Sequence, residues 1–157
     1  MPSIHLTTFI AAPVDRVFDL SRSINLHKIS TAHTGEEAVA GTTTGLIGKG
    51  ETVTWRARHL FKTRQLTSKI TALESPNMFT DEMTEGDFTQ LYQEHHFKAI
   101  DNGTIMIDQL QFETPYGILG RWLNRFFLTS YLEKLLQQRN AVIKNYAETD
   151  KWKAILR

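Results

Sequence analysis

A long amphipathic helix near the end of the chain constrains the fold more than any other feature of the sequence. It is predicted from residue 118 to about residue 148, after Thr114-Pro115-Tyr116-Gly117, because apolar side chains recur there at helical spacing. The stripe consists of Leu119, Trp122, Leu123, Phe126, Tyr131, Leu135, Val142, Ile143 and Tyr146. So broad a face needs a large concave partner, which the strand-like segments before it can supply as a curved sheet. A curved sheet around a helix leaves an internal cavity, which indicates a ligand-holding domain.

The composition indicates a soluble globular protein. A chain of 157 residues, 41% of them hydrophobic, is long enough to bury a core, so we predict one domain over residues 1–157. The formal net charge of +1 favours neither nucleic acid nor a membrane surface as a partner. The absence of cysteine excludes disulfides, thiolate zinc sites and a cysteine nucleophile. With no signal peptide and no run of ~18 apolar residues, we expect a cytoplasmic protein without stable membrane insertion.

Strand and helix signals follow one another in an order that predicts an α+β fold. A strand is predicted over residues 4–10, and Pro13 suits the first turn of a short helix. A second short helix is predicted over residues 23–29. The Gly- and Thr-rich residues 36–50 predict a strand and a loop, since no Gly-Lys-Ser/Thr completes a phosphate-binding loop. Alternating patterns predict further strands over residues 51–61, 63–73, 78–84 and 88–100.

Asn102-Gly103 is the strongest local turn signal. Between two alternating segments it favours a two-residue hairpin loop of type I′. The resulting pairs are Asp101–Thr104, Phe97–Asp108, His95–Leu110 and Gln93–Phe112. This register places the less charged faces of the two strands on the same side of the sheet, which supports the predicted hairpin.

Five segments carry a likeness to known proteins: residues 12–18, 51–59, 66–70, 94–97 and 104–117, which read APVDRVF, ETVTWRARH, LTSKI, EHHF and TIMIDQLQFETPYG. With these segments the sequence resembles the START-like, or SRPBCC, superfamily, and within it most closely the bacterial polyketide cyclase/dehydratase-like proteins. The resemblance implies a helix-grip fold: a curved antiparallel sheet of six to seven strands around the C-terminal helix, with two short helices after the first strand. It also implies a long cavity that holds lipids, sterols, polyketides or other apolar molecules, and some members are cyclases or dehydratases.

Several polar side chains are predicted to point into this cavity. They are His59, Arg64, Asp81, Gln93, His95 and Asp108, each on the less charged face of its strand. Charged groups on such a face need partners, water or a polar ligand. They therefore form a buried network, orient a ligand, or act in catalysis. In the last case His95, with its tautomer fixed by a diagonal neighbour Asp108, is the candidate acid/base.

Metal and cofactor sites are not predicted. His95 and His96 are adjacent on a strand and point to opposite faces. His59, His95 and Asp108 have suitable ligand atoms, but no motif spacing supports a site. His5, His27 and His33 are interpreted as surface or loop residues.

Apolar side chains are predicted to line the rest of the cavity. They are Trp55, Leu66, Ile70, Met83, Leu91, Phe97, Leu110, Phe112, Trp122, Leu123 and Phe126. Arg121, Arg125, Lys134 and Arg139 are predicted on the outer, solvated face of the helix. Phe127, Leu128 and Leu132 broaden the apolar surface and are candidates for a homodimer contact or a gate at the cavity mouth.

Three functions remain open from the sequence. The first is binding of a small apolar or amphipathic molecule between sheet and helix. The second is a cyclase- or dehydratase-like reaction that uses the His95–Asp108 pair. The third is a non-catalytic interaction module with a filled core that dimerises or docks a partner through the helix.

Overall fold

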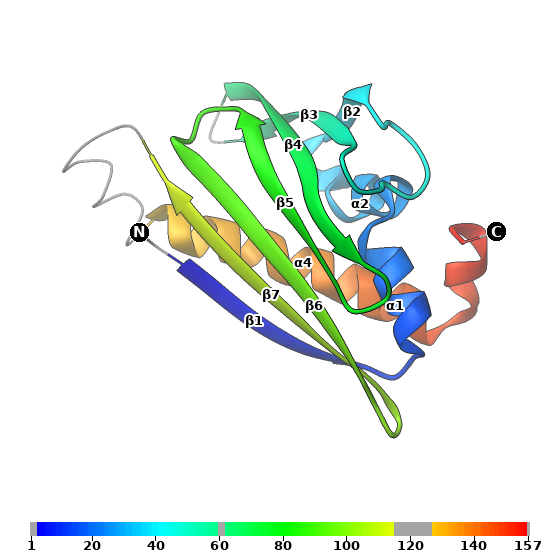
Figure 1. Cartoon of the computed structure of the whole chain (residues 1–157). Helices are drawn as coiled ribbons and strands as arrows, with labels where there is room; N and C mark the ends of the chain where they lie inside the picture. Colours follow the sequence, from blue (N-terminus) through cyan, green and yellow to red (C-terminus); the bar gives the residue numbers. More distant parts are fainter. Residues whose placement is uncertain (1–2, 60–61, 115–126, 157) are drawn as a thin grey trace.

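One curved antiparallel sheet wraps around one long helix. The computed structural model describes residues 3–59, 62–114 and 127–156. In the described chain the sheet has seven strands in the order β1-β7-β6-β5-β4-β3-β2, and it curls around α4 (Figure 1). The strands are β1 (Ser3–Ile10), β2 (Glu37–Gly41), β3 (Thr52–His59), β4 (Lys62–Glu74), β5 (Met78–Glu85), β6 (Gln90–Ile100) and β7 (Gly103–Glu113). The helices within the described residues are α1 (Val14–Ser21), α2 (Ile24–Ser30) and α4 (Thr129–Glu148), with short 3-10 turns η1 (Ala32–Thr34) and η3 (Asp150–Ala154).

This arrangement confirms the predicted helix-grip fold. The predicted end of the long helix at residue 148 agrees with the last residue of α4. Its predicted beginning at residue 118 lies outside the described residues, as do Trp122, Leu123 and Phe126. None of the helices in the described ranges combines the length and the apolar character needed to cross a membrane.

Each of the two short helices begins directly after a residue that favours a helix start. Pro13 is the extended residue before α1, and the Ser23 side chain caps α2 by accepting a hydrogen bond from the Leu26 N–H at 3.1 Å. Both helices pack against α4 and support its C-terminal half (Figure 1). The buried Phe18 of α1 meets Phe79 and Phe97 edge to face, with ring centroids 5.8 and 5.2 Å apart. The three rings form the aromatic part of the core next to the C-terminal end of α4.

The β6–β7 hairpin forms, but its predicted turn and register are wrong. Asp101 and Asn102 make the turn, Gly103 already pairs with Ile100, and the register is shifted by two residues from the prediction. The position of Gly103 in the strand, and not in the turn, has a steric reason. A Cβ on Gly103 would lie against the carbonyl oxygen of Ile10 at the end of β1, and Gly103 does not have the positive φ of a type I′ turn.

A two-residue shift leaves every side chain on its predicted face, because side chains alternate with a period of two. His95 and Phe97 of β6 are buried, as are Met106, Asp108 and Leu110 of β7. The observed register places His95 directly opposite Asp108 instead of diagonal to it, which brings the two side chains into direct contact.

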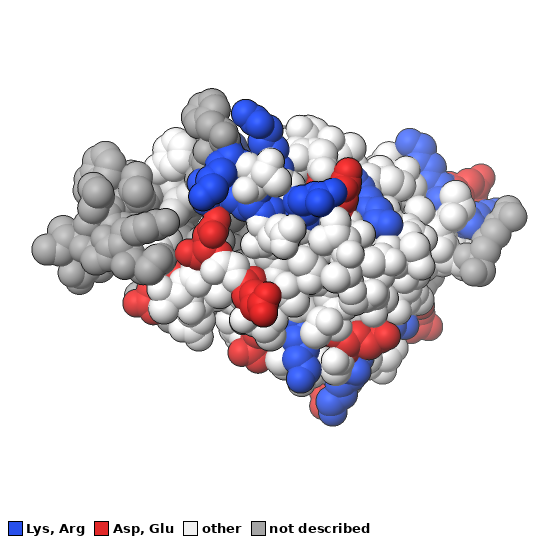
Figure 2. Space-filling model, turned by 90° about the horizontal axis from the view of Figure 1, so that it is seen from above, with Lys and Arg blue, Asp and Glu red and all other residues white. Residues whose placement is uncertain are grey.

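The outer surface carries charges of both signs. Figure 2 shows Lys and Arg side chains near both the upper and the lower edge of the view, with Asp and Glu side chains beside them. Some opposite charges on the surface form ion pairs. Arg56 of β3 pairs with Glu37 of β2, with 2.7 Å between Nη2 and Oε2. No field of one sign covers this face, and the absence of a nucleic-acid partner stays a prediction.

Candidate functional site

A cavity of about 590 Å³ lies between the concave face of the sheet, α2 and α4. Most of its described wall is apolar. Five of the predicted apolar lining residues line it: Trp55, Leu66, Ile70, Leu91 and Leu110. Three others do not: Phe97 is buried in the aromatic core, and Phe112 and Met83 belong to a second apolar cluster around Leu110 and Leu136.

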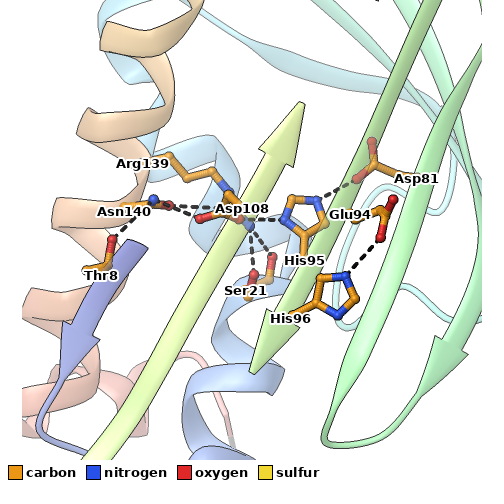
Figure 3. A network of polar contacts seen from close by, with 9 residues as sticks. All are labelled: Thr8, Ser21, Asp81, Glu94, His95, His96, Asp108, Arg139 and Asn140. Carbon is orange, nitrogen blue, oxygen red and sulfur yellow. Dashed lines mark hydrogen bonds and ion pairs between the residues drawn. The ribbon is translucent and has the colours of Figure 1, made fainter. Parts of the chain in front are cut away.

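A polar cluster lies between the strands β5, β6 and β7 and the helices α1 and α4 (Figure 3). His95 is fully enclosed between two carboxylates: its Nδ1 lies 2.7 Å from Asp108 Oδ1 and its Nε2 lies 2.8 Å from Asp81 Oδ2. Asp81 and His95 line the cavity, whereas Asp108 is only 1% exposed and faces the helix. The structure thus brings together three of the six predicted polar site residues.

Two residues of α4 complete this cluster from the other side. Asn140 Nδ2 donates to Asp108 Oδ2 at 2.8 Å, and Arg139 Nη1 lies 3.5 Å from Asp108 Oδ1. Arg139 also donates to the hydroxyl of Ser21 in α1, at 2.7 Å. The cluster therefore ties the sheet to α1 and α4.

The predicted outward position of Arg139 is wrong. The residue is 7% exposed because its charge is balanced by Asp108 inside the protein. The spacing held a signal for this, since Tyr131, Leu135, Arg139 and Ile143 are four residues apart and share one helix face.

The electrostatics of the cluster favour a charged His95. Burial alone would lower the pKa of His95, but the hydrogen bonds to Asp108 and Asp81 outweigh it, so the pKa is raised. Burial would raise the pKa of Asp108, but His95 and Arg139 reverse this and lower it. Both ring nitrogens of His95 then donate to carboxylates, and neither is free to accept a proton from a ligand.

His96 lies on the opposite face of β6, as predicted. Figure 3 shows it pointing away from His95 toward Glu94, with 2.9 Å between its Nε2 and Glu94 Oε1. In the described parts of the chain, no three His, Asp or Glu side chains form a group that could hold a metal ion. In particular, His59 does not join His95 and Asp108.

His59 instead belongs to a second polar cluster, which is not predicted from the sequence. Its Nδ1 lies 2.6 Å from the Tyr131 hydroxyl of α4, and its Nε2 lies 3.7 Å from Glu36 Oε2. Glu36 Oε1 also meets Nε2 of His27 at 2.8 Å. The interpretation of His27 as a surface or loop residue is wrong: it lies in α2, lines the cavity and packs on the Trp55 ring, with centroids 4.3 Å apart.

Glu36 is the ionised centre of this second cluster. Burial would raise its pKa, but the hydrogen bonds and charges of His27 and His59 lower it to about 2. The Glu36 carboxylate thus faces the imidazole rings of both His27 and His59, and His59 Nδ1 shares a hydrogen bond with the Tyr131 hydroxyl. No sequence motif marks this cluster, because its members are distant in the chain.

Arg64 and Gln93 also line the cavity, at different places. Arg64 Nη1 pairs with Asp87 Oδ2 at 2.6 Å, and its Nε donates to the backbone oxygen of His59. Gln93 lies on β6 directly opposite Asp81 of β5. Phe127, before α4, lines the cavity while 52% exposed, so its role as a gate or homodimer contact stays a prediction.

Residues 1–148 match the family model described as polyketide cyclase / dehydrase and lipid transport. The match covers nearly the whole chain. The chain belongs to this family. The resemblance to SRPBCC proteins is thereby confirmed, whereas a comparison with curated protein sequences found no significant match.

Solved structures share the fold of this polyketide cyclase/dehydrase-type chain. TTHA0849 from Thermus thermophilus has a TM-score of 0.76 at 19% identity, over 99% of this chain and 100% of that one. The ZhuI aromatase/cyclase from Streptomyces sp. R1128 has a TM-score of 0.75 at 17% identity, over 94% and 93%. Major latex-like protein 151 from Panax ginseng has a TM-score of 0.70 at 16% identity, over 94% and 98%. At these identities the likeness establishes the shared fold.

Proposed function

We propose that the protein binds a small, largely apolar or amphipathic molecule between the sheet and α4. The observation that carries this proposal is the cavity of about 590 Å³, with a mainly apolar wall and a few polar groups set into it. Ligand pockets typically have ~300–1,000 Å³ and this kind of lining. The family description, which includes lipid transport, supports the same function.

The polar groups in the wall suit a ligand-orienting role better than acid/base catalysis by His95. A general base needs an unprotonated nitrogen within reach of its substrate. His95 has Asp108 on one ring nitrogen and Asp81 on the other, which together with its raised pKa favours a fixed imidazolium. We therefore favour binding over the cyclase- or dehydratase-like reaction.

Partly filling the cavity should weaken binding without unfolding the protein. Leu135 of α4 lines the cavity, so a tryptophan there occupies ligand volume. In Leu135→Trp we expect the affinity for the neutral apolar fluorophore N-phenyl-1-naphthylamine to fall at least about tenfold, as measured by fluorescence titration. Native mass spectrometry followed by solvent extraction should also recover less co-purifying small molecule from this variant.

Gln138→Trp is the matched control, because Gln138 is exposed on the same helix. It should bind the fluorophore like the unsubstituted protein. Equal affinity in Leu135→Trp, with both variants folded by circular dichroism, would place the binding site elsewhere and contradict the proposal.

A further inference from the structure

We propose that Asp81 and Gln93 form a recognition pair for a hydroxyl group, and that the ligand is a neutral apolar molecule carrying such a hydroxyl. This inference rests on the proposed function and narrows it to a chemical class. Alcohols and phenols with a rigid hydrocarbon body belong to this class, whereas fatty-acid anions do not.

The sheet register brings the two side chains together. Asp81 of β5 and Gln93 of β6 are directly opposite each other, and both line the cavity. Directly opposed residues have Cβ atoms only about 4.5–5.5 Å apart, so one small group can touch both side chains. A hydroxyl oxygen can lie between them.

The hydrogen-bonding capacity of the pair is only partly used. Asp81 Oδ2 meets His95 Nε2 at 2.8 Å, while Asp81 Oδ1 has no side-chain partner among the described residues. The side-chain amide of Gln93 likewise has no partner in the described chain. A ligand hydroxyl would donate its proton to Asp81 Oδ1 and accept a hydrogen bond from the Gln93 amide N–H. The ligand hydroxyl then acts as a hydrogen-bond donor and as an acceptor at the same time.

The charges around the pair select a neutral group. Two carboxylates, Asp81 and Asp108, are balanced by His95 and Arg139 in the same cluster. An ammonium ligand would leave an uncompensated positive charge in a largely apolar cavity, and a carboxylate ligand would face the Asp81 carboxylate.

Other cations of the cavity wall offer no alternative site for an anion. Arg22 pairs with Asp19 at 3.0 Å, and Arg64 pairs with Asp87 at 2.6 Å. Within the described ranges, each arginine that lines the cavity thus already has a carboxylate partner. A free fatty-acid head group would have to share its arginine with the carboxylate already paired there.

The neighbours of the pair indicate what the rest of the ligand is. Ile70 is opposite Asp81 on one side and Leu110 is opposite Gln93 on the other, and both are buried apolar residues in the cavity wall. A hydroxyl bound here is therefore attached directly to an apolar body, which packs against these side chains.

Three matched probes test the inference: trans-4-hydroxystilbene, trans-4-methoxystilbene and trans-stilbene-4-carboxylate. They share one apolar body and differ in the polar group. By isothermal titration calorimetry the unsubstituted protein should bind the hydroxyl compound about tenfold or more tightly than either of the others. In Gln93→Leu the preference for hydroxyl over methoxy should shrink severalfold, and in Asp81→Asn the carboxylate should gain affinity.

The matched control is Gln109→Leu, since Gln109 is exposed on the opposite face of β7. It should keep the full hydroxyl preference. Equal affinities for the hydroxyl and methoxy compounds would overturn the inference and leave the proposed function standing. An unchanged preference in Gln93→Leu would do the same. Failure of all three probes to bind, together with no effect of Leu135→Trp on the fluorophore, would overturn both.

Discussion

Asp108→Ala is expected to lower the free energy of unfolding by about 3–5 kcal/mol, because it leaves buried charges without a partner. Asp108 is 1% exposed and is bonded to His95, Asn140 and Arg139. In the alanine variant His95 keeps only Asp81, and Arg139 keeps only neutral partners. The loss should appear as a lower urea midpoint at neutral pH with a similar slope.

Asp101→Ala is the control for this prediction. Asp101 lies in the exposed β6–β7 turn, so its removal should change the free energy of unfolding by no more than about 0.5 kcal/mol. Equal losses in the two variants would mean that the cluster around Asp108 does not hold α4 to the sheet.

Glu36→Gln is expected to cost about 3 kcal/mol at pH 7 and to flatten the acid limb of the stability curve. The pKa of Glu36 falls from its ordinary 4.5 to about 2 on folding, and a shift of this size corresponds to about 3 kcal/mol. A lowered pKa stabilises the fold above pH 4.5, and this contribution is lost as the pH falls through about 2. The gap between the two proteins should thus narrow below pH 4.5, as measured by urea unfolding at several pH values.

Glu37→Gln is the matched control, because Glu37 is the next residue in the chain. The Glu37 side chain is 62% exposed in its pair with Arg56, so the substitution should leave both the stability and the acid limb nearly unchanged. A constant difference between Glu36→Gln and the unsubstituted protein from pH 7 down to pH 3 would show that the charge of Glu36 does not stabilise the second cluster.

The sequence predicts the fold and the faces of the strands because both depend on periodicity. Alternation alone placed His95 and Asp108 inside, and it did so despite a wrong register, since a shift of two residues preserves the face. Turn chemistry was less reliable. Position 103 requires a glycine because a Cβ there would clash with the end of β1. This contact joins segments far apart in the sequence, so the local turn pattern does not reveal it.

The polar clusters were harder to predict than the apolar wall. From the sequence alone Arg139 is expected to be solvated, because its partner Asp108 lies on a distant strand. His27, Glu36, His59 and Tyr131 come from four separate segments, and no local pattern relates them. Burial of apolar residues follows from their own character, whereas burial of a charge depends on a partner that only the tertiary structure supplies.

The pairing of β1 with β7 has a consequence for how the chain is made. Ser3 is opposite Gln111 and Ile10 is opposite Thr104, so the first strand has its partner about a hundred residues later. The ribosome makes β1 before β7, so β1 stays unpaired until about a hundred further residues have been synthesised. Pairing of β1, and with it docking of α4 onto β1, therefore follows the synthesis of all the other strands of the sheet.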